Sequence, residues 1–111
     1  MAQDKVVRTA LLTAQFANGK VVDRVEIKSI DLPANTQVGL HLHPCPVVGI
    51  VVQGKILFQV EGQEQQVLNS GDAFHEPANV HIPHFDSLDE PARFIAFYLL
   101  GEDESELIRM L

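Results

Sequence analysis

Short apolar runs separated by turn residues dominate the pattern of hydrophobic and polar positions along the chain. Gly54, Glu61-Gly62 and Ser70-Gly71-Asp72 supply turn signals between these runs. Strands this short, with turns every roughly 8–12 residues, are typical of all-β sandwiches and barrels, so we predict an all-β fold. The clearest runs are Val47–Val52, Ile56–Val60, Gln65–Leu68 and Arg93–Leu100.

The two ends of the chain give separate predictions. Asn18-Gly19 is a favourable hairpin dipeptide, and it predicts a hairpin between the runs Leu11–Phe16 and Val21–Ile27. In the segment Glu102–Leu111, acidic residues precede apolar ones. Acidic side chains suit a helix N-terminus, so this segment predicts a short C-terminal helical turn.

Composition and charge narrow the class of protein. With 111 residues, the chain is expected to form a single domain spanning residues 1–111. A net charge of −7 argues against nucleic-acid partners. No run reaches the roughly 18 apolar residues of a membrane span, and Met1–Lys5 lacks the apolar core of a secretory signal, so we expect a cytoplasmic protein without membrane contact. The lone Cys45 excludes an internal disulfide and a four-cysteine metal site.

A pair of histidines is the first sign of chemistry. His41 and His43 are separated by one residue, so on a strand both imidazoles would point to the same side. Two histidines on one face can supply half of a metal site.

The surroundings of this pair resemble the first motif of the cupin superfamily. That motif has an opening glycine, a His-x-His pair, a glutamate and a closing glycine. His41, His43 and Gly54 match it, and Asn35 stands at the opening glycine. Asn tolerates positive φ, so the turn chemistry is kept. Val47 stands at the glutamate position, which is a substantive departure.

A second segment resembles the second cupin motif. Gly71 and Pro77 match at the right spacing, and Asn79 replaces a second glycine. Ile82 stands at the histidine position and Asp86 at the asparagine position. The resemblance covers approximately residues 22–100. It implies a double-stranded β-helix, or jelly-roll, barrel and a homodimer. The run Val47–Val52, apolar on both faces, fits a strand covered on both sides.

The resemblance also implies one divalent metal ion (Fe, Zn, Ni, Cu or Mn), of whose family ligands only His41 and His43 survive here. If Ile82 points into the barrel, strand alternation makes His84 the better third ligand. A register irregularity at Pro83 would favour His81 instead.

Further residues beside the motifs have two interpretations each. Asp86 could orient His84 as a carboxylate partner, or be a loop residue. Cys45 could reach the barrel mouth, or be a buried inert thiol. Glu76, next to His75, could be a ligand or general base, or an exposed strand-end residue, because nothing in the sequence fixes its direction.

Two functions therefore follow from the sequence. One is a metal-dependent cupin acting on a small organic molecule in a dioxygenase- or isomerase-like reaction. The other is a non-catalytic cupin that binds or senses a small ligand and has a degenerate metal site. The residues alone leave open whether the protein is an enzyme.

Overall fold

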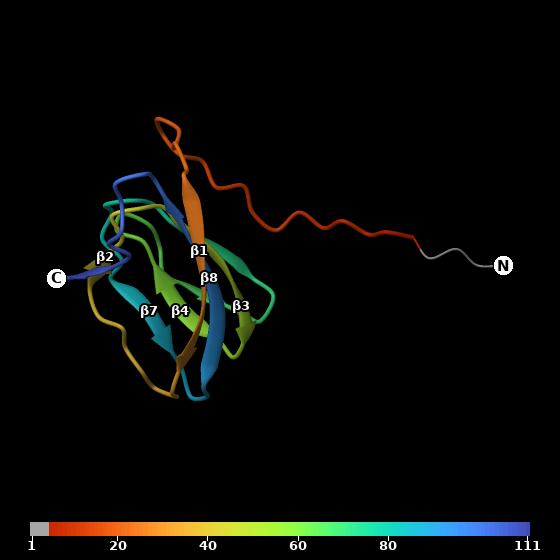
Figure 1. The fold of residues 1–111 in the computed structure, drawn as a ribbon. Coiled ribbons are helices and arrows are strands. Elements are labelled where there is room, and N and C mark those ends of the chain that lie inside the picture. Colours follow the sequence, from red (N-terminus) through yellow and green to blue (C-terminus); the bar gives the residue numbers. More distant parts are fainter. Residues whose placement is uncertain (1–4) are drawn as a thin grey trace.

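A computed structural model describes residues 5–111, and every regular element among them is a β-strand (Figure 1). The all-β prediction is therefore confirmed. No helix in this range is long and apolar enough to cross a membrane. The strands are β1 (Arg24–Leu32), β2 (His41–Leu42), β3 (Val47–Gln53), β4 (Ile56–Gln59), β5 (Gln66–Leu68), β6 (Ala73–Glu76), β7 (His84–Ser87), β8 (Ala92–Leu100) and β9 (Arg109–Met110).

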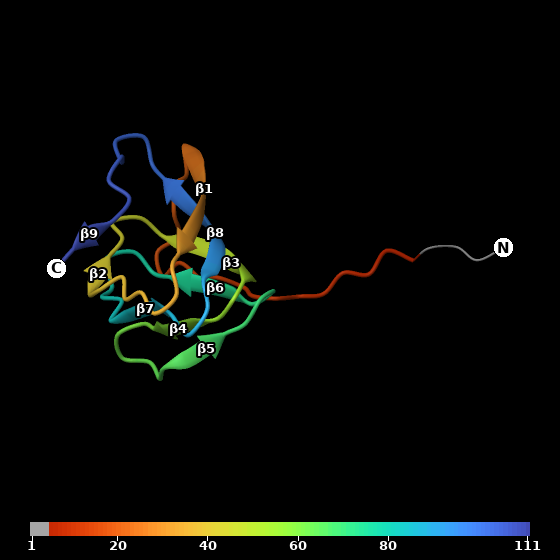
Figure 2. The same cartoon turned by 90° about the horizontal axis from the view of Figure 1, so that it is seen from below.

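The strands form three sheets. A four-stranded sheet has the order β1-β8-β3-β6, a three-stranded sheet has the order β5-β4-β7, and β2 pairs with β9 at one end (Figure 2). All pairs of strands in these sheets are antiparallel. From β5 to β8 each successive strand lies in the other of the two larger sheets, as in a jelly roll, whereas β4 and β5 are neighbours in one sheet. The pairing of the described strands leaves separate sheets, however, rather than one closed barrel.

The core lies between the two larger sheets. Phe74 and Phe94 from the four-stranded sheet meet Phe58 and Phe85 from the three-stranded sheet, with ring centroids 4.6–6.0 Å apart. Such tilted and edge-on aromatic contacts stabilise beyond the area they bury. This cluster holds the sheets face to face and positions the inner side chains of β6 and β8.

The turns follow the predicted backbone chemistry. Asn35 and Asn79 have φ values of 57° and 61°, so each takes the left-handed conformation expected where glycine is replaced. Gly54 has a φ of 76° between β3 and β4, and a Cβ atom there would overlap the Pro91 carbonyl oxygen. The spacing of turn residues thus predicted the corners of the fold correctly.

The predicted N-terminal hairpin is wrong. Asn18-Gly19 does form a turn, with the Gly19 amide donating to the Phe16 carbonyl at 2.9 Å. The residues before it form no strand. From Lys5 the chain approaches the body of the molecule as an extended segment (Figure 1), and residues 11–16 lie beside the four-stranded sheet. β1 pairs with β8 along nine residues, and no described strand pairs with its other edge.

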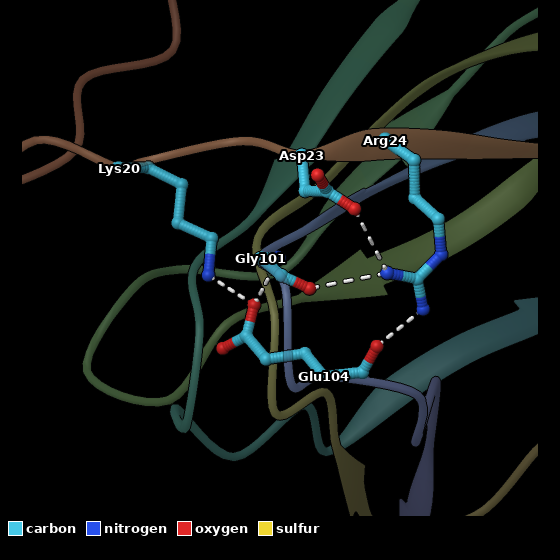
Figure 3. Close-up of polar contacts among 5 residues, drawn as sticks. All are labelled: Lys20, Asp23, Arg24, Gly101 and Glu104. Carbon is cyan, nitrogen blue, oxygen red and sulfur yellow. Dashed lines mark hydrogen bonds and ion pairs between the residues drawn. The ribbon is translucent and has the colours of Figure 1, made fainter.

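The predicted C-terminal helical turn is also wrong. Glu104 carboxylate accepts from the Gly101 amide at 2.6 Å, as at a helix start, but Lys20 contacts the same carboxylate (Figure 3). Arg24 donates to the carbonyls of Gly101 and Glu104. These contacts hold the segment against β1, and the residues that follow pair with β2 as β9. Tertiary pairing therefore outweighs local helix preference.

Candidate metal centre

The two motif histidines lie side by side at the end where β2 meets β9. His41 and His43 are almost fully buried, and their rings lie 5.0 Å apart. The His41 backbone pairs with Met110 on one side and with Ile82 on the other. Because pairing on both sides fixes the backbone, both rings are held on the inner face, as predicted.

Backbone carbonyls orient both rings. His41 Nδ1 lies 2.7 Å from the Gly39 carbonyl oxygen, and His43 Nδ1 lies 2.7 Å from the Leu107 carbonyl oxygen. A carbonyl only accepts, so each Nδ1 carries the hydrogen and donates it. The neutral form of each ring then has its lone pair on Nε2, the arrangement found in metal-binding histidines.

The third group at the centre is Glu76, at the end of β6. Its Oε2 atom lies 3.4 Å from His41 Nε2 and 3.2 Å from His43 Nε2. The side chain is buried, with 3% of the residue exposed. Glu76 stands directly opposite Val47 in the pairing of β3 with β6. Directly paired residues share a face, so the carboxylate lies across the strand pair from the position of the first-motif glutamate.

These three groups cannot satisfy one another without a cation. Two Nε2 lone pairs and a carboxylate face each other, and none of them can donate a hydrogen bond in its unprotonated form. Burial alone would lower the pKa of His43, but the hydrogen bond and charge of Glu76 outweigh burial, and the pKa of His43 is raised. Burial would raise the pKa of Glu76, yet hydrogen bonds from His41 and His43 outweigh it, and the pKa is lowered. A proton on His43 is therefore one way to fill the centre.

A metal ion is the other way, and the residues fit it. One ligand atom from each of His41, His43 and Glu76 lies within 4.8 Å of the others. Two imidazoles and one carboxylate suit Fe(II), Mn(II) or Zn(II). Three protein ligands leave coordination positions open, as in catalytic rather than structural metal sites. The group could therefore hold a divalent metal with room for a further molecule.

A cavity of about 220 Å³ opens beside this group. Tyr98 lies on its wall, with its ring 6.0 Å from that of His43. Burial, followed by the charge of Glu76, raises the pKa of Tyr98 to about 12, so its hydroxyl stays protonated at neutral pH.

The structure brings neither His84 nor His81 into the group. His84 Nδ1 lies 2.8 Å from Asp86 Oδ2, so the predicted contact between these two residues is present. Between them Phe85 lines the cavity, and side chains alternate along a strand, so His84 and Asp86 point to the opposite face of β7. His81 is half-buried, and its Nδ1 atom pairs with Glu61 at 2.9 Å, away from the group.

Cys45 lies in the core rather than at the cavity wall. It is fully buried, and burial raises the pKa of its thiol, so the sulfur stays protonated. Cys45 is therefore a buried thiol that is not among the described residues lining the cavity.

The sequence offers Glu76 as a candidate ligand without fixing the direction of its side chain. The missing information was the register of β6 against β3. Phe74 and Glu76 alternate with His75, and Phe74 is buried in the core, so Glu76 also points inward. The large apolar side chain two residues before Glu76 is the sequence signal that could have identified it.

Comparison with solved structures shows the same fold in proteins of low sequence identity. A DMSP lyase, DddQ, from Ruegeria pomeroyi DSS-3 superposes with a TM-score of 0.69 at 18% identity, over 79% of this chain and 43% of the lyase chain. An oxalate oxidase in complex with the substrate analogue glycolate gives 0.66 at 18% identity, over 78% of this chain and 46% of the oxidase chain. The chain thus spans less than half the length of each.

A smaller protein is also similar. A cupin-like protein from Thermotoga maritima MSB8 gives a TM-score of 0.65 at 24% identity, over 78% of this chain and 64% of that one. No curated protein matches the chain. At these identities the likenesses establish the fold alone. The family model for the cupin domain matches residues 29–98 of this chain, which include His41, His43 and Glu76 as well as both motifs. The chain therefore belongs to the cupin family.

Proposed function

We propose that this cupin holds one divalent metal ion through His41, His43 and Glu76 and acts on a small organic molecule in an oxygenase- or isomerase-like reaction. The observation that carries the proposal is the convergence of two Nε2 lone pairs and one buried carboxylate, with each Nδ1 already bound to a carbonyl. The similarity to a lyase and an oxidase supports a catalytic use of this fold.

The protein residues have defined tasks in this proposal. A bound ion would supply Lewis-acid or oxygen-binding chemistry at its open positions. The carbonyls of Gly39 and Leu107 hold the two rings in the ligating tautomer. The wall of the cavity is mostly apolar, and the protonated Tyr98 hydroxyl can donate a hydrogen bond to a molecule bound there.

The test is elemental analysis of protein purified without added metal. We expect close to one equivalent of a divalent transition metal in the native protein. Replacing both His41 and His43 with alanine should abolish it, whereas His81→Ala, which alters a half-buried histidine outside the group, should leave it unchanged. Equal metal content in the native protein and the double variant would refute the proposal.

A second candidate function is a binding or sensing cupin without turnover. It is favoured by the lining of the cavity, where, among residues 5–111, Tyr98 is the one ionisable side chain besides the three candidate ligands. A site with so few groups to move protons can bind a molecule without converting it. Stoichiometric metal and saturable ligand binding, without change of the ligand over many hours, would support this candidate over the catalytic one.

A further inference from the structure

The cavity beside the metal group has a uniform lining. Apart from His41, His43, Glu76 and Tyr98, every side chain on its wall is a hydrocarbon. None of the described residues that line it is a lysine or an arginine, and none has an amide or aliphatic hydroxyl side chain. The apolar lining residues are Ile30, Leu32, Val38, Phe85, Phe94, Ala96 and Ile108.

This lining restricts the charge of a ligand away from the metal. A second ionised group on the ligand would lie against hydrocarbon, with no cation to pair with it. Burying an unpaired carboxylate is costly, because the apolar surroundings replace none of its hydration. The part of the ligand that points away from the centre must therefore be apolar.

The centre itself restricts the charge of the ligand head. A divalent ion held by two neutral imidazoles and the Glu76 carboxylate retains one positive charge. In surroundings of low polarity that charge is best neutralised by one negative charge. A monoanion therefore fits the centre, whereas a dianion leaves one negative charge without a partner. Oxygen donors suit the open positions of a centre that already contains a carboxylate.

The volume of the cavity also limits the size of the ligand. Its volume of about 220 Å³ exceeds the roughly 150 Å³ of a cavity that accepts benzene, but falls below the roughly 300–1,000 Å³ of common ligand pockets. The space suits a molecule of about six to ten non-hydrogen atoms.

We infer that the cavity binds a small monoanion with an oxygen-donor head and a short apolar tail, and discriminates against dicarboxylates. The inference rests on the proposed metal site and adds the chemical class of its ligand. The lining, the charge at the centre and the volume all lead to this class.

A matched pair of acids tests the inference. Malate and 2-hydroxybutanoate have the same hydroxy-acid head, and malate carries a carboxylate where the other acid has a methyl group. Each is titrated into Co(II)-loaded full-length protein, with the visible absorption of the bound cobalt as the readout. Metal content is measured before the titration and again after desalting, which shows whether an acid has stripped the ion. We expect 2-hydroxybutanoate to bind at least about tenfold more tightly than malate.

Two variants make the test specific to the cavity. Ile108 lines the cavity and Val52 does not, yet each is 42% exposed, so a lysine at either position can keep its ammonium in water. Ile108→Lys adds a cation at the wall and should shift the preference toward malate by about tenfold or more. Val52→Lys adds the same charge elsewhere and should leave the ratio of affinities unchanged.

The outcomes separate this inference from the proposed function. Failure of the native protein to hold cobalt would overturn both. Bound cobalt with malate binding equally or more tightly, or with neither acid binding at millimolar concentration, would overturn the inference alone. An equal shift in Ile108→Lys and Val52→Lys would also overturn it, because the selectivity would then reflect net charge and not the lining.

Discussion

At the scale of single residues, the centre is defined by three acceptors that need a shared cation. The carboxylate is the group that turns two histidines into a site, because it supplies the negative charge and the third ligand atom. In the absence of metal, a proton on His43 fills the same role, and the raised pKa of His43 and the lowered pKa of Glu76 report that pairing.

Glu76→Gln should remove metal binding while preserving the fold. The amide has the same shape and can donate hydrogen bonds to the Nε2 atoms of His41 and His43, so neither ring nitrogen is left without a donor. We expect metal affinity to fall by more than about 100-fold. Losing a residue that only orients a ligand already costs about 10–100-fold, and Glu76 is itself a proposed ligand. Glu61→Gln, at an exposed carboxylate, is the control, and unchanged affinity in Glu76→Gln would contradict the site.

The metal-free protein should show a pH window of extra stability. The raised pKa of His43 means that its contribution is present below the ordinary value of 6.5 and is lost as pH rises through the raised pKa. The lowered pKa of Glu76 means that its contribution is present above 4.5 and is lost as pH falls through the lowered pKa. With chelator present, the difference in unfolding free energy between native protein and Glu76→Gln should therefore peak between these values. Chemical denaturation across pH measures it, and a flat difference would refute the pairing.

Only part of this centre is predictable from the sequence, because one of its groups joins the others through strand register. His41 and His43 are close in the chain, so strand alternation alone placed them together. Glu76 joins them only through the register of β6 against β3, which no local pattern encodes. His84 was preferred as a ligand by counting alternation from Ile82, but Pro83 interrupts the strand before β7 begins, and Phe85 takes the inward position.

At the scale of elements, β2 organises the centre from both sides. It pairs with β9, and through His41 it also pairs with Ile82. The segment before β9 provides the Leu107 carbonyl that orients His43. The segment around β9 therefore supports the site although it contributes no ligand. Its acidic residues favour a helix locally, and its pairing with β2 could not be predicted because β2 is distant in the sequence.

Deleting residues 107–111 should weaken metal binding without removing a ligand. The deletion removes the carbonyl acceptor of His43 Nδ1 and the partner strand of β2. Loss of such an orienting partner costs about 10–100-fold in metal affinity. Arg109→Ala, which breaks only an exposed ion pair with Glu106, is the control and should have little effect. Competition with a chromophoric chelator measures both affinities, and equal affinities would show that the carbonyl does not matter.

Ile82→His should increase the affinity of the centre for a divalent metal ion. Ile82 is fully buried and exchanges two backbone hydrogen bonds with His41, so their side chains lie on one face, about 5 Å apart at Cβ. A histidine there would stand at the position of the second-motif ligand and offer a fourth donor. We expect binding at least about tenfold tighter, or about 1.4 kcal/mol. Weaker binding in a folded variant would show that this position faces away from the centre.

At the scale of the whole molecule, the outer face of the four-stranded sheet has apolar side chains without a complete cover. Residues 11–16 lie over part of it, and an open groove of about 400 Å³ remains between them and the sheet. At the sheet edge, Val25 and Ile27 of β1 are 44% and 62% exposed. Apolar surface of this extent on one face is characteristic of a protein–protein contact. The groove is lined by Leu11, Leu12, Ala14, Phe16, Val48, Gly49, Ile50, Ala73, Phe74, Phe97 and Leu99.

We expect a second copy of the chain to cover this face. The second copy presents the same apolar sheet face and N-terminal segment, so a two-fold contact would cover the apolar faces of both copies at once. We expect a dimer by light scattering at micromolar concentration. Ile27→Glu should give a folded monomer, since the position is exposed in the single chain and the charge costs that chain about 0.5 kcal/mol or less. Val67→Glu, which is 46% exposed on β5 of the other sheet, should remain dimeric. A monomeric native protein, or a dimer unaffected by Ile27→Glu, would place the partner of this face elsewhere.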